Sequence, residues 1–492
     1  MVNRVTIYFL LILCIPTLAQ GSNQIQYEQM ITEMNGLSLP LVNIVTDVDS
    51  LSSTFYPGYI EFCSYDKTKD LVEKRKYPCD LRYRGGSSLA YEKKSFAFKL
   101  RYENGDSWDT NLFGIRKESS WILDAMSIDR IRMRNRLCFD LWNEFSKTPY
   151  FTEFDKRNGT KGQFVEVFLN GNYHGLYCLT DKINRKLLNL RSPSMVNDST
   201  VKIRGVLYKG QRWQDVDGEA TDIFLLSYKE DKTDGKYWNA WELQHPEDYP
   251  SKETWQQLMD LIDFCSSKTP DIEFINQWKS YFDPTNLADY MVLTFALNVG
   301  DNAYKNTFLS TQDITVGHQF IITPWDMDMS FGGYYDGGYN DVSADIHRYD
   351  GIAPYNRLFS PNVDGFYSLV KMKWELLRNT VFSISHVFEL IDKYAQLFVK
   401  SGAWARECSL WNARPVPLKD DIYDEIDYVK NWYIKNYNSL IDQFTNTGIQ
   451  QPTNSEPINK VYGIDGRKIS INDTRRLSQG LYIINGKKII VR

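Results

Sequence analysis

Two short segments of the chain carry the side chains best suited to chemistry. Asp301 and Asn306 lie five positions apart, and Asp326 and Asp328 follow about twenty residues later. Carboxylate and amide oxygens are ligands of Mg²⁺, and a carboxylate placed beside an acceptor hydroxyl group can take its proton. With a cation for the remaining phosphate charge, these residues fit phosphoryl transfer from a nucleotide.

An aspartate and an asparagine at this spacing, with an aspartate downstream, match the catalytic loop and metal-binding motif of ordinary protein kinases. Two features differ here: no His-Arg precedes Asp301, and Asp326-Met327-Asp328 stands where Asp-Phe-Gly is expected. Alone, the Asp-x-x-x-x-Asn pattern is weak, because both residue types are common in turns. Asp328 can equally ligate a metal ion or cap the next turn.

The surrounding elements predict that the two segments meet. Asp283-Pro284 opens a helix that is expected to end at Gly300, and two strand-like runs follow, Thr307–Leu309 and Phe320–Ile322. A polar turn containing Gly317 separates the runs. A hairpin of these runs returns the chain to its start, so the second aspartate pair should lie beside the first segment.

A glycine turn forms a second cluster of interest. Residues Arg82–Ser88 follow a strand and precede Lys93-Lys94 and a further strand. A glycine turn flanked by cations and hydroxyl groups can approach phosphates. Taken alone, the same residues are better explained as an ordinary hairpin loop.

Six motifs together resemble the spore coat protein H (CotH) family of atypical kinases in order and spacing. They are Arg82–Ser88, Lys94-Ser95, Trp121–Leu123 with Arg134-Asn135, Glu166–Gly171 with Gly175–Tyr177, Asp301–Asn306, and Pro324–Asp326. The resemblance covers about residues 40–400. It implies a secreted or surface kinase with a protein-kinase-like fold, which uses ATP and Mg²⁺ to phosphorylate serine or threonine.

The resemblance also implies roles for single residues. Asp301 would be the catalytic aspartate, Asn306 and Asp326 would be metal ligands, and Lys94 would be the leading phosphate-binding cation. Asp328 is a further candidate metal ligand.

The phosphate-binding group has alternatives. Lys209 can replace the leading lysine, Arg84 can share its work, and the Ser87 hydroxyl group is a further candidate. After Gly175–Tyr177 the family pattern predicts a glutamate, but this sequence has Asp181. The shorter side chain would weaken an ion pair with the lysine.

The rest of the chain predicts a two-lobed α+β fold, strand-rich in its N-terminal half and helix-rich in its C-terminal half. Asn170-Gly171 predicts a tight hairpin in a mostly antiparallel sheet. The expected strands are 41–45, 59–63, 81–84, 96–100, 164–169 and 176–179. The expected helices are 128–145, 253–265, 284–300, 365–378, 385–399 and 421–444. Trp121, Trp142 and Trp325 are expected in the core.

Composition agrees with a large folded core and narrows the partners. The chain has 492 residues, of which 42% are hydrophobic, and a net charge of -5 gives no reason to expect nucleic acid. Only five histidines occur, none in a metal-ligand spacing such as HExxH, so zinc chemistry is not expected. Most cysteines are expected as buried thiols, with Cys63 and Cys79 the one pair worth testing as a disulfide.

The two ends indicate export. Residues 1–19 have the pattern of a secretory signal peptide, and no later stretch is long enough to cross a membrane. The kinase-like domain is expected over 25–445, a linker over 446–458, and a small β tail over 459–492. The tail resembles the sorting tail of type IX secretion substrates. A secreted or cell-surface location follows, with an exported protein substrate and the secretion machinery as partners.

Two other function classes fit the same residues. One keeps the fold without activity, as a surface binding or assembly module. The other is metal-assisted hydrolysis by the aspartate cluster, which is disfavoured because the histidines and glutamates usual in such sites are missing.

Overall fold

The computed structural model describes residues 26–150, 157–197, 200–211, 233–238, 240–303, 305–350 and 352–446, together with the backbone of four short C-terminal strands. The signal peptide expected over 1–19 and nearly all of the linker expected over 446–458 lie outside these residues, so both stay predictions. None of the described helices is both long and apolar enough to cross a membrane.

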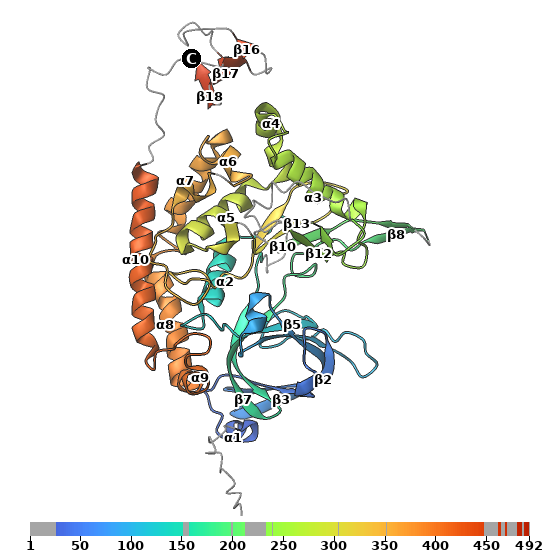
Figure 1. The fold of residues 1–492 in the computed structure, drawn as a ribbon, viewed down its shortest axis with the longest axis vertical. Helices are drawn as coiled ribbons and strands as arrows, with labels where there is room; N and C mark the ends of the chain where they lie inside the picture. The colour runs from blue at the N-terminus through green and yellow to red at the C-terminus, as the bar shows by residue number, and fades with distance from the viewer. Residues whose placement is uncertain are drawn as a thin grey trace, which may run out of the picture.

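A closed barrel of seven strands forms the N-terminal part of the fold, at the bottom of Figure 1. Its strands are β1 (Leu41–Val45), β2 (Tyr56–Asp66), β3 (Leu71–Arg84), β4 (Ser95–Leu100), β5 (Ser120–Asp124), β6 (Gly162–Leu169) and β7 (Asn172–Asp181). Their order around the barrel is β1-β2-β3-β4-β5-β7-β6. The predicted antiparallel sheet is confirmed, but a parallel pairing of β1 with β6 closes it.

Local chemistry explains the turn between β6 and β7. Asn170 and Gly171 both have positive φ, 49° and 82°, which is the backbone that the predicted Asn-Gly hairpin requires. The Asn170 side chain accepts a hydrogen bond from the Thr46 N–H at 3.0 Å and donates to the Thr46 carbonyl at 2.9 Å. The turn is therefore fastened to the end of β1, beside the strand pairing that closes the barrel.

A second sheet lies above the barrel in Figure 1, and two of its strands adjoin the two acidic segments identified in the sequence. Its order is β11-β12-β10-β13-β14, with β10 (Val206–Gly210), β11 (Tyr237–Trp238), β12 (Trp241–His245), β13 (Thr307–Thr311) and β14 (Ile321–Pro324). The predicted hairpin is confirmed as β13 and β14, with Thr307 opposite Pro324. Sequence analysis did not predict β10, which pairs with β13 across about one hundred residues. A separate two-stranded ribbon consists of β8 (Ser194–Asn197) and β9 (Thr200–Lys202).

Helices pack around this second sheet and form one large core with it. They are α2 (Arg134–Phe145), α3 (Lys252–Cys265), α4 (Asp271–Tyr281), α5 (Pro284–Leu297), α6 (Tyr355–Leu358), α7 (Phe366–Leu377), α8 (Ile384–Lys400), α9 (Ala403–Trp411) and α10 (Ile422–Asn446), while α1 (Tyr27–Thr32) lies at the barrel. Figure 1 shows α10 running along the outer edge beside α8. The six predicted helices are all present, and the two-part α+β architecture is confirmed.

The predicted helix 128–145 starts six residues later than expected. Asp129 accepts hydrogen bonds from the N–H groups of Met133 and Arg134, both at 2.7 Å, and so caps the helix from outside. Arg132 has φ 54°, which interrupts the helical backbone. The apolar spacing of residues 128–133 therefore reflects a buried turn.

The six described cysteines are all buried thiols, as most were expected to be. Cys63 and Cys79 do lie in the paired strands β2 and β3, but Cys63 faces Lys74 and Cys79 faces Gly58. The two thiols are out of register, so the suggested disulfide does not form.

The C-terminal segment forms a small sheet of four strands in the order β16-β15-β17-β18. They are β15 (Val461–Gly463), β16 (Lys468–Ile469), β17 (Gly480–Ile484) and β18 (Lys487–Val491). The tail sequence predicts strands at 460–462, 481–484 and 488–491, and β15, β17 and β18 confirm them, while β16 is additional. A role of this tail in sorting stays a prediction.

Candidate active site

The loop that carries Asp301 begins where α5 ends. Asp283 caps the start of α5 by accepting from the Asn286 N–H at 2.7 Å, and Pro284 occupies the first turn. At the other end Asn298 adopts a left-handed conformation with φ 47°, three residues before Asp301. The helix thus ends at Leu297, slightly earlier than predicted, and delivers the chain to the site.

Hydrogen bonds join loop 300–306 to the turn 325–331 along their whole length. The Trp325 N–H donates to the Asn306 carbonyl at 2.9 Å, and the Gly300 N–H donates to the Met329 carbonyl at 3.2 Å. Between these ends, the Asn302 side-chain amide donates to the carbonyls of Asn306 and Trp325, both at 2.9 Å. The structure therefore brings together the two segments that the sequence predicted to meet.

Asp301 lies between two side chains of its own loop. One of its carboxylate oxygens is 2.8 Å from the Lys305 ammonium nitrogen, and the same oxygen accepts from the Asn306 amide at 3.4 Å. Sequence analysis missed Lys305. Its position four residues after Asp301 was the available signal, because residues at that spacing face each other across one turn.

Asp326 and Asp328 sit on the turn that follows β14. Asp326 has φ 54° and Asn306 has φ 55°, a left-handed backbone that asparagine and aspartate tolerate better than most residues. The protein around Asp326 raises the pKa of this solvent-accessible carboxyl group; Asp124 adds to that rise and Arg84 opposes it. Burial also raises the pKa of Asp328 well above its usual range, and Asp326 adds to that rise. The carboxyl groups of Asp124, Asp326 and Asp328 therefore lie close enough to oppose one another's ionisation.

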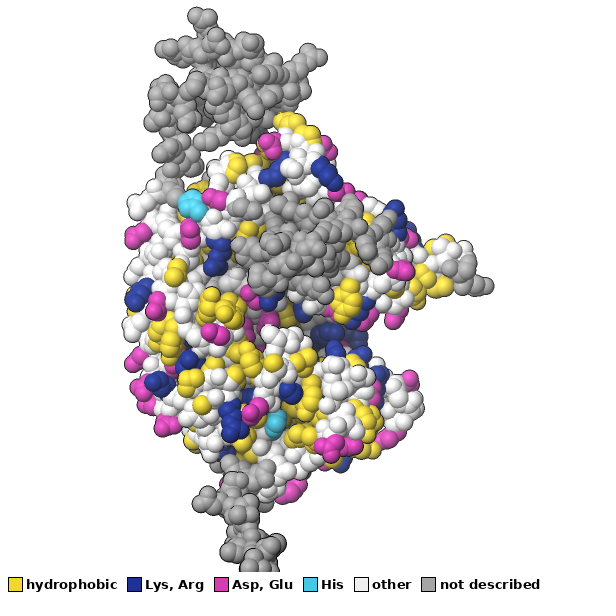
Figure 2. Space-filling model, viewed as in Figure 1, with side chains coloured by type: hydrophobic (Ala, Val, Ile, Leu, Met, Phe, Trp, Pro, Cys, Tyr) yellow, Lys and Arg dark blue, Asp and Glu magenta, His cyan; other side chains and the backbone are white. Residues whose placement is uncertain are grey.

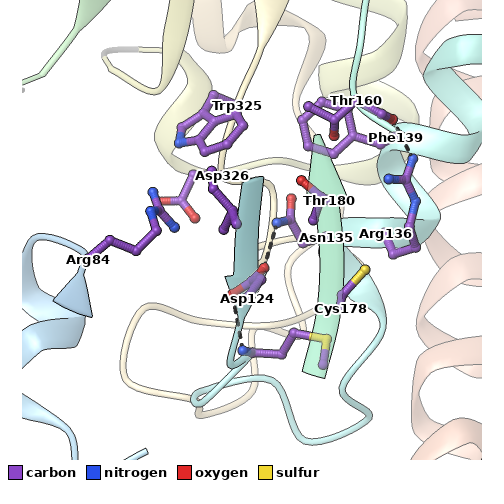
Figure 3. Close-up of a pocket in the computed structure, with 12 residues that line it drawn as sticks. Arg84, Asp124, Asn135, Arg136, Phe139, Thr160, Cys178, Thr180, Trp325 and Asp326 are labelled. Atoms are coloured by element: carbon purple, nitrogen blue, oxygen red, sulfur yellow. Dashed lines mark hydrogen bonds between the residues drawn. The ribbon is translucent and has the colours of Figure 1, made fainter. Parts of the chain in front are cut away.

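A small pocket opens beside this turn. Figure 3 shows Arg84, Asp124, Asn135, Trp325 and Asp326 around it, and the Asp326 carboxylate faces the Arg84 guanidinium. Sequence analysis gave no role to Asp124 or Asn135. Figure 2 shows a hollow between the barrel and the upper part of the molecule, in which Lys and Arg side chains gather.

Two cations approach the ring of Trp325 from different sheets. Arg84, at the end of β3, has its guanidinium carbon 5.6 Å from the ring centroid, and Lys209, on β10, has its ammonium nitrogen 5.9 Å away. Burial lowers the pKa of Lys209, Arg84 adds to that fall, and Asp326 opposes it. Trp325 is partly buried: it packs against the large core, as predicted, but it also lines the pocket. Trp121 and Trp142 are buried core residues as predicted.

Lys94 holds the loop that follows the glycine turn by hydrogen bonds to its backbone. Its ammonium group donates to the carbonyls of Leu89 and Tyr91, both at 2.8 Å. Ser87 is exposed at the start of the short 3₁₀ turn Ser87–Ala90. Gly85 has φ 135°, and a Cβ there would lie 2.0 Å from the Ser88 hydroxyl oxygen, so this position requires glycine. The described contacts of Lys94 are thus with the loop itself, and its role toward phosphate stays a prediction.

Asp181 is held by arginines. Its carboxylate is 2.7 Å from Arg116 and 3.4 Å from Arg157, and its other oxygen accepts from the Lys161 N–H at 2.8 Å. Asp181 is fully buried, so these partners satisfy it within the protein. The suggested pairing of this residue with the phosphate-binding lysine is not among its contacts.

The donor set fits Mg²⁺ in kind. Within the described ranges, no group of three or more His, Cys, Asp or Glu side chains is arranged to hold a metal ion. Asp326 and Asp328 nevertheless have no hydrogen bond or ion pair with any described side chain. Mg²⁺ is usually bound by one or two carboxylates together with substrate phosphates. Two such carboxylates beside the amide of Asn306 suit that mode of binding.

This arrangement suits an enzyme that handles phosphate groups, and the family comparison agrees. The family model described as CotH kinase protein matches residues 81–440, so the chain belongs to this family. The family implies a kinase, and therefore ATP as the phosphate donor. The matched region contains the glycine turn, loop 300–306 and the turn 325–331, and it extends further toward the C-terminus than the motifs suggested. Among curated proteins, the sequence found no match.

Proposed function

We propose that this protein is an exported kinase that transfers the γ-phosphoryl group of ATP to serine or threonine of another exported protein, with Mg²⁺ as its metal ion. Family membership supports the reaction class. The observation that carries the proposal is the ladder of hydrogen bonds between loop 300–306 and turn 325–331, which gathers Asp301, Asn306 and Asp326 at one place.

Asp301 has the position of the residue that receives the acceptor hydroxyl group. Lys305 fixes one of its oxygens through the 2.8 Å ion pair, and Asn306 donates to that same oxygen. The second oxygen can then accept a hydrogen bond from a serine or threonine hydroxyl. A carboxylate so oriented contributes by positioning the nucleophile and accepting its proton.

The remaining residues would bind the phosphate groups. Asn306, Asp326 and Asp328 are the side chains that would hold Mg²⁺, which when bound bridges phosphate oxygens and neutralises their charge. Arg84 and Lys209 interact electrostatically with Asp326 and with each other. Two neighbouring cations repel, so an anion such as a phosphate group placed between them would relieve that repulsion.

Thermal unfolding of the mature chain tests binding. ATP with Mg²⁺ at 100 times its dissociation constant should stabilise the native state by about 2.7 kcal/mol. Asp326→Ala should abolish the metal-dependent part of this shift, whereas Asp301→Ala should keep the shift and lose phosphoryl transfer. Asp271→Ala is the control, because Asp271 is 91% exposed on α4.

Two results would contradict the proposal. If neither ATP nor a non-hydrolysable analogue stabilises the wild type, the protein is a binding or assembly module with a kinase-like sequence. If Asp301→Ala and Asp326→Ala keep full transfer, the residue roles are wrong. A separate experiment, incubation of the mature chain with labelled ATP and the proteins secreted by its own host, would identify the acceptor protein.

Export is a separate part of the proposal and rests on the two ends of the chain. N-terminal sequencing of the secreted form should begin close to residue 20. Deletion of residues 459–492 should leave the kinase domain folded but change where it accumulates. Recovery of the full chain, uncleaved, from inside the cell would contradict this part alone.

A further inference from the structure

The side chain of Asn135 bridges two parts of the site that are far apart in sequence. Its amide nitrogen donates to Asp124 at 3.1 Å, and its amide oxygen accepts from the Met327 N–H at 3.1 Å. Asp124 ends β5 of the barrel, Asn135 lies in the first turn of α2, and Met327 stands between Asp326 and Asp328. Figure 3 shows the hydrogen bond from Asn135 to Asp124 beside the pocket.

The same helix holds the other polar group of the Met327 backbone. One turn after Asn135, the Cys138 thiol lies 3.7 Å from the Met327 carbonyl oxygen and 3.1 Å from the Ser330 hydroxyl oxygen. The Met327 side chain itself is 0% exposed. Helix α2 therefore contacts the Met327 N–H group and the Met327 carbonyl group, and the Met327 side chain is buried.

Such contacts matter for the turn 325–331, called the acidic turn from here on. Asp326 and Asp328 have no hydrogen bonds or ion pairs with described side chains, so the backbone between them sets where their carboxyl groups lie. A misplacement of about 1 Å at a reacting centre can cost about a hundredfold in rate. Contacts that fix the backbone between the two carboxylates would keep both in place.

Asp124 is satisfied by its own contacts. Besides the Asn135 amide, its carboxylate accepts from the Met126 N–H at 3.1 Å and from the Ser95 hydroxyl group at 3.4 Å. These contacts bind Asp124 to the end of the barrel. The hydrogen bonds thus run without a break from the barrel through Asn135 to the turn.

We propose that Asp124 and Asn135 are a pair of positioning residues, which set the acidic turn against the barrel so that Asp326 and Asp328 bind the metal–nucleotide complex. The inference rests on the proposed function, but the pair itself is defined by its hydrogen bonds. It touches the turn through Met327, so it acts on ligand binding indirectly.

An exchange of the two residues gives a sharp test. Asn135→Asp places two carboxylates together, and Asp124→Asn leaves the amide of Asn135 without its charged acceptor. The double variant D124N/N135D restores both hydrogen bonds. The amide introduced at position 124 can donate to the carboxylate introduced at position 135, and that carboxylate can accept from the Met327 N–H. The double variant also keeps the net charge of the wild type.

The measurement is the dissociation constant of a non-hydrolysable ATP analogue with Mg²⁺, by calorimetry. Each single variant should weaken binding by about tenfold or more, since each loses the charge-assisted hydrogen bond between positions 135 and 124. The double variant should return to within about threefold of the wild type. Binding in the double variant that is as weak as the two single effects combined would overturn the pair and assign Asp124 a direct contact with the ligand.

A matched variant separates positioning from stability. Asn143, on the same helix, donates from its side chain to the Thr160 carbonyl at 2.8 Å and makes no hydrogen bond to the acidic turn. Asn143→Asp should lower the melting temperature without changing the dissociation constant. An equal loss of binding in Asn143→Asp would mean that any weakening of α2 has this effect, and the pair would have no special role.

Hydrogen exchange of the peptide that contains residues 325–331 gives a readout without any ligand. Its amides should be protected in the wild type and in D124N/N135D, and less protected in each single variant. If the wild type binds no nucleotide but this pattern holds, the proposed function fails while the positioning pair stands. Equal protection in all four proteins would overturn the pair even if nucleotide binds.

Discussion

The ammonium nitrogen of Lys93 lies 2.6 Å from a carboxylate oxygen of Glu407, and neither side chain has any solvent exposure. The same oxygen is 2.8 Å from the Arg132 guanidinium, and the other oxygen accepts from the Leu176 N–H at 2.7 Å. Burial lowers the pKa of Lys93 to about 7. Burial opposes the charged form of Glu407, but Lys93 and Arg132 outweigh it and lower the pKa of Glu407. Helix α9, β7 and the segment before β4 therefore meet at one buried carboxylate.

Removal of that carboxylate should destabilise the whole domain. Glu407→Gln leaves the buried Arg132 guanidinium without its carboxylate and forces Lys93 to stay unpaired or lose its proton. Breaking a buried pair in this way costs about 3–5 kcal/mol. Urea unfolding of the mature chain measures the change. Glu92→Gln is the matched control, because Glu92 and Arg414 form an exposed pair at 3.1 Å, which should contribute less than about 1 kcal/mol. Equal losses in the two variants would contradict the prediction.

The two candidate phosphate-binding lysines should behave differently. Lys209 interacts with Asp326 and Arg84 at the pocket, whereas Lys94 donates to two carbonyls of the glycine turn. Lys209→Met should therefore weaken binding of ATP with Mg²⁺ by about tenfold or more, as expected for a lost charged hydrogen bond. Lys94→Met should have a smaller effect on binding and should increase hydrogen exchange in residues 85–91. The reverse order in titration calorimetry would support the assignment made from the family resemblance.

Sequence patterns predicted the parts of the site that depend on local structure. The meeting of Asp301 with Asp326 followed from one hairpin, because a short turn between β13 and β14 fixes their register. The caps of α5 were equally local, since Asp283 and Pro284 are adjacent in the sequence. These contacts join residues within about forty positions of each other, and residue type alone carries the necessary information.

Long-range pairing explains what the sequence did not predict. Lys209 reaches the pocket because β10 pairs with β13, and Lys209 then lies opposite Phe308. Closure of the barrel depends on β1 meeting β6, with Leu41 opposite Glu166. The alternation of apolar residues does not indicate which strand, about one hundred residues away, a given strand pairs with. Asn135 belongs to one of the family motifs. Its role depends on the contact of α2 with the acidic turn, which the motif does not show.

The partly buried His174 predicts a loss of stability in mild acid. Burial lowers the pKa of His174 from 6.5 to about 4, with Lys93 adding to the effect. The unfolded chain binds a proton near pH 6.5, but the folded protein does so only near pH 4, so stability is full above pH 6.5 and falls as the pH approaches 4. The loss is at most about 3 kcal/mol. His174→Phe keeps a ring in this place and should flatten the dependence of unfolding free energy on pH in this window. An unchanged slope would contradict the prediction.

Trp325 should matter because its ring keeps two cations together. Arg84 and Lys209 lie 5.6 and 5.9 Å from the ring centroid, and each cation–π contact of a partly desolvated cation contributes about 0.5–2 kcal/mol. Trp325→Leu removes the attraction and leaves the repulsion between the cations, so binding of ATP with Mg²⁺ should weaken by about tenfold, converted from that energy. Trp325→Phe keeps an aromatic face and should lose less.

The salt dependence of the dissociation constant separates the two explanations for any loss. If the ring orders the cations, the leucine variant binds with a shallower salt dependence than the wild type, because fewer charges contact the phosphates at once. A leucine variant that binds as tightly as the wild type would show that the two cations are held by other contacts.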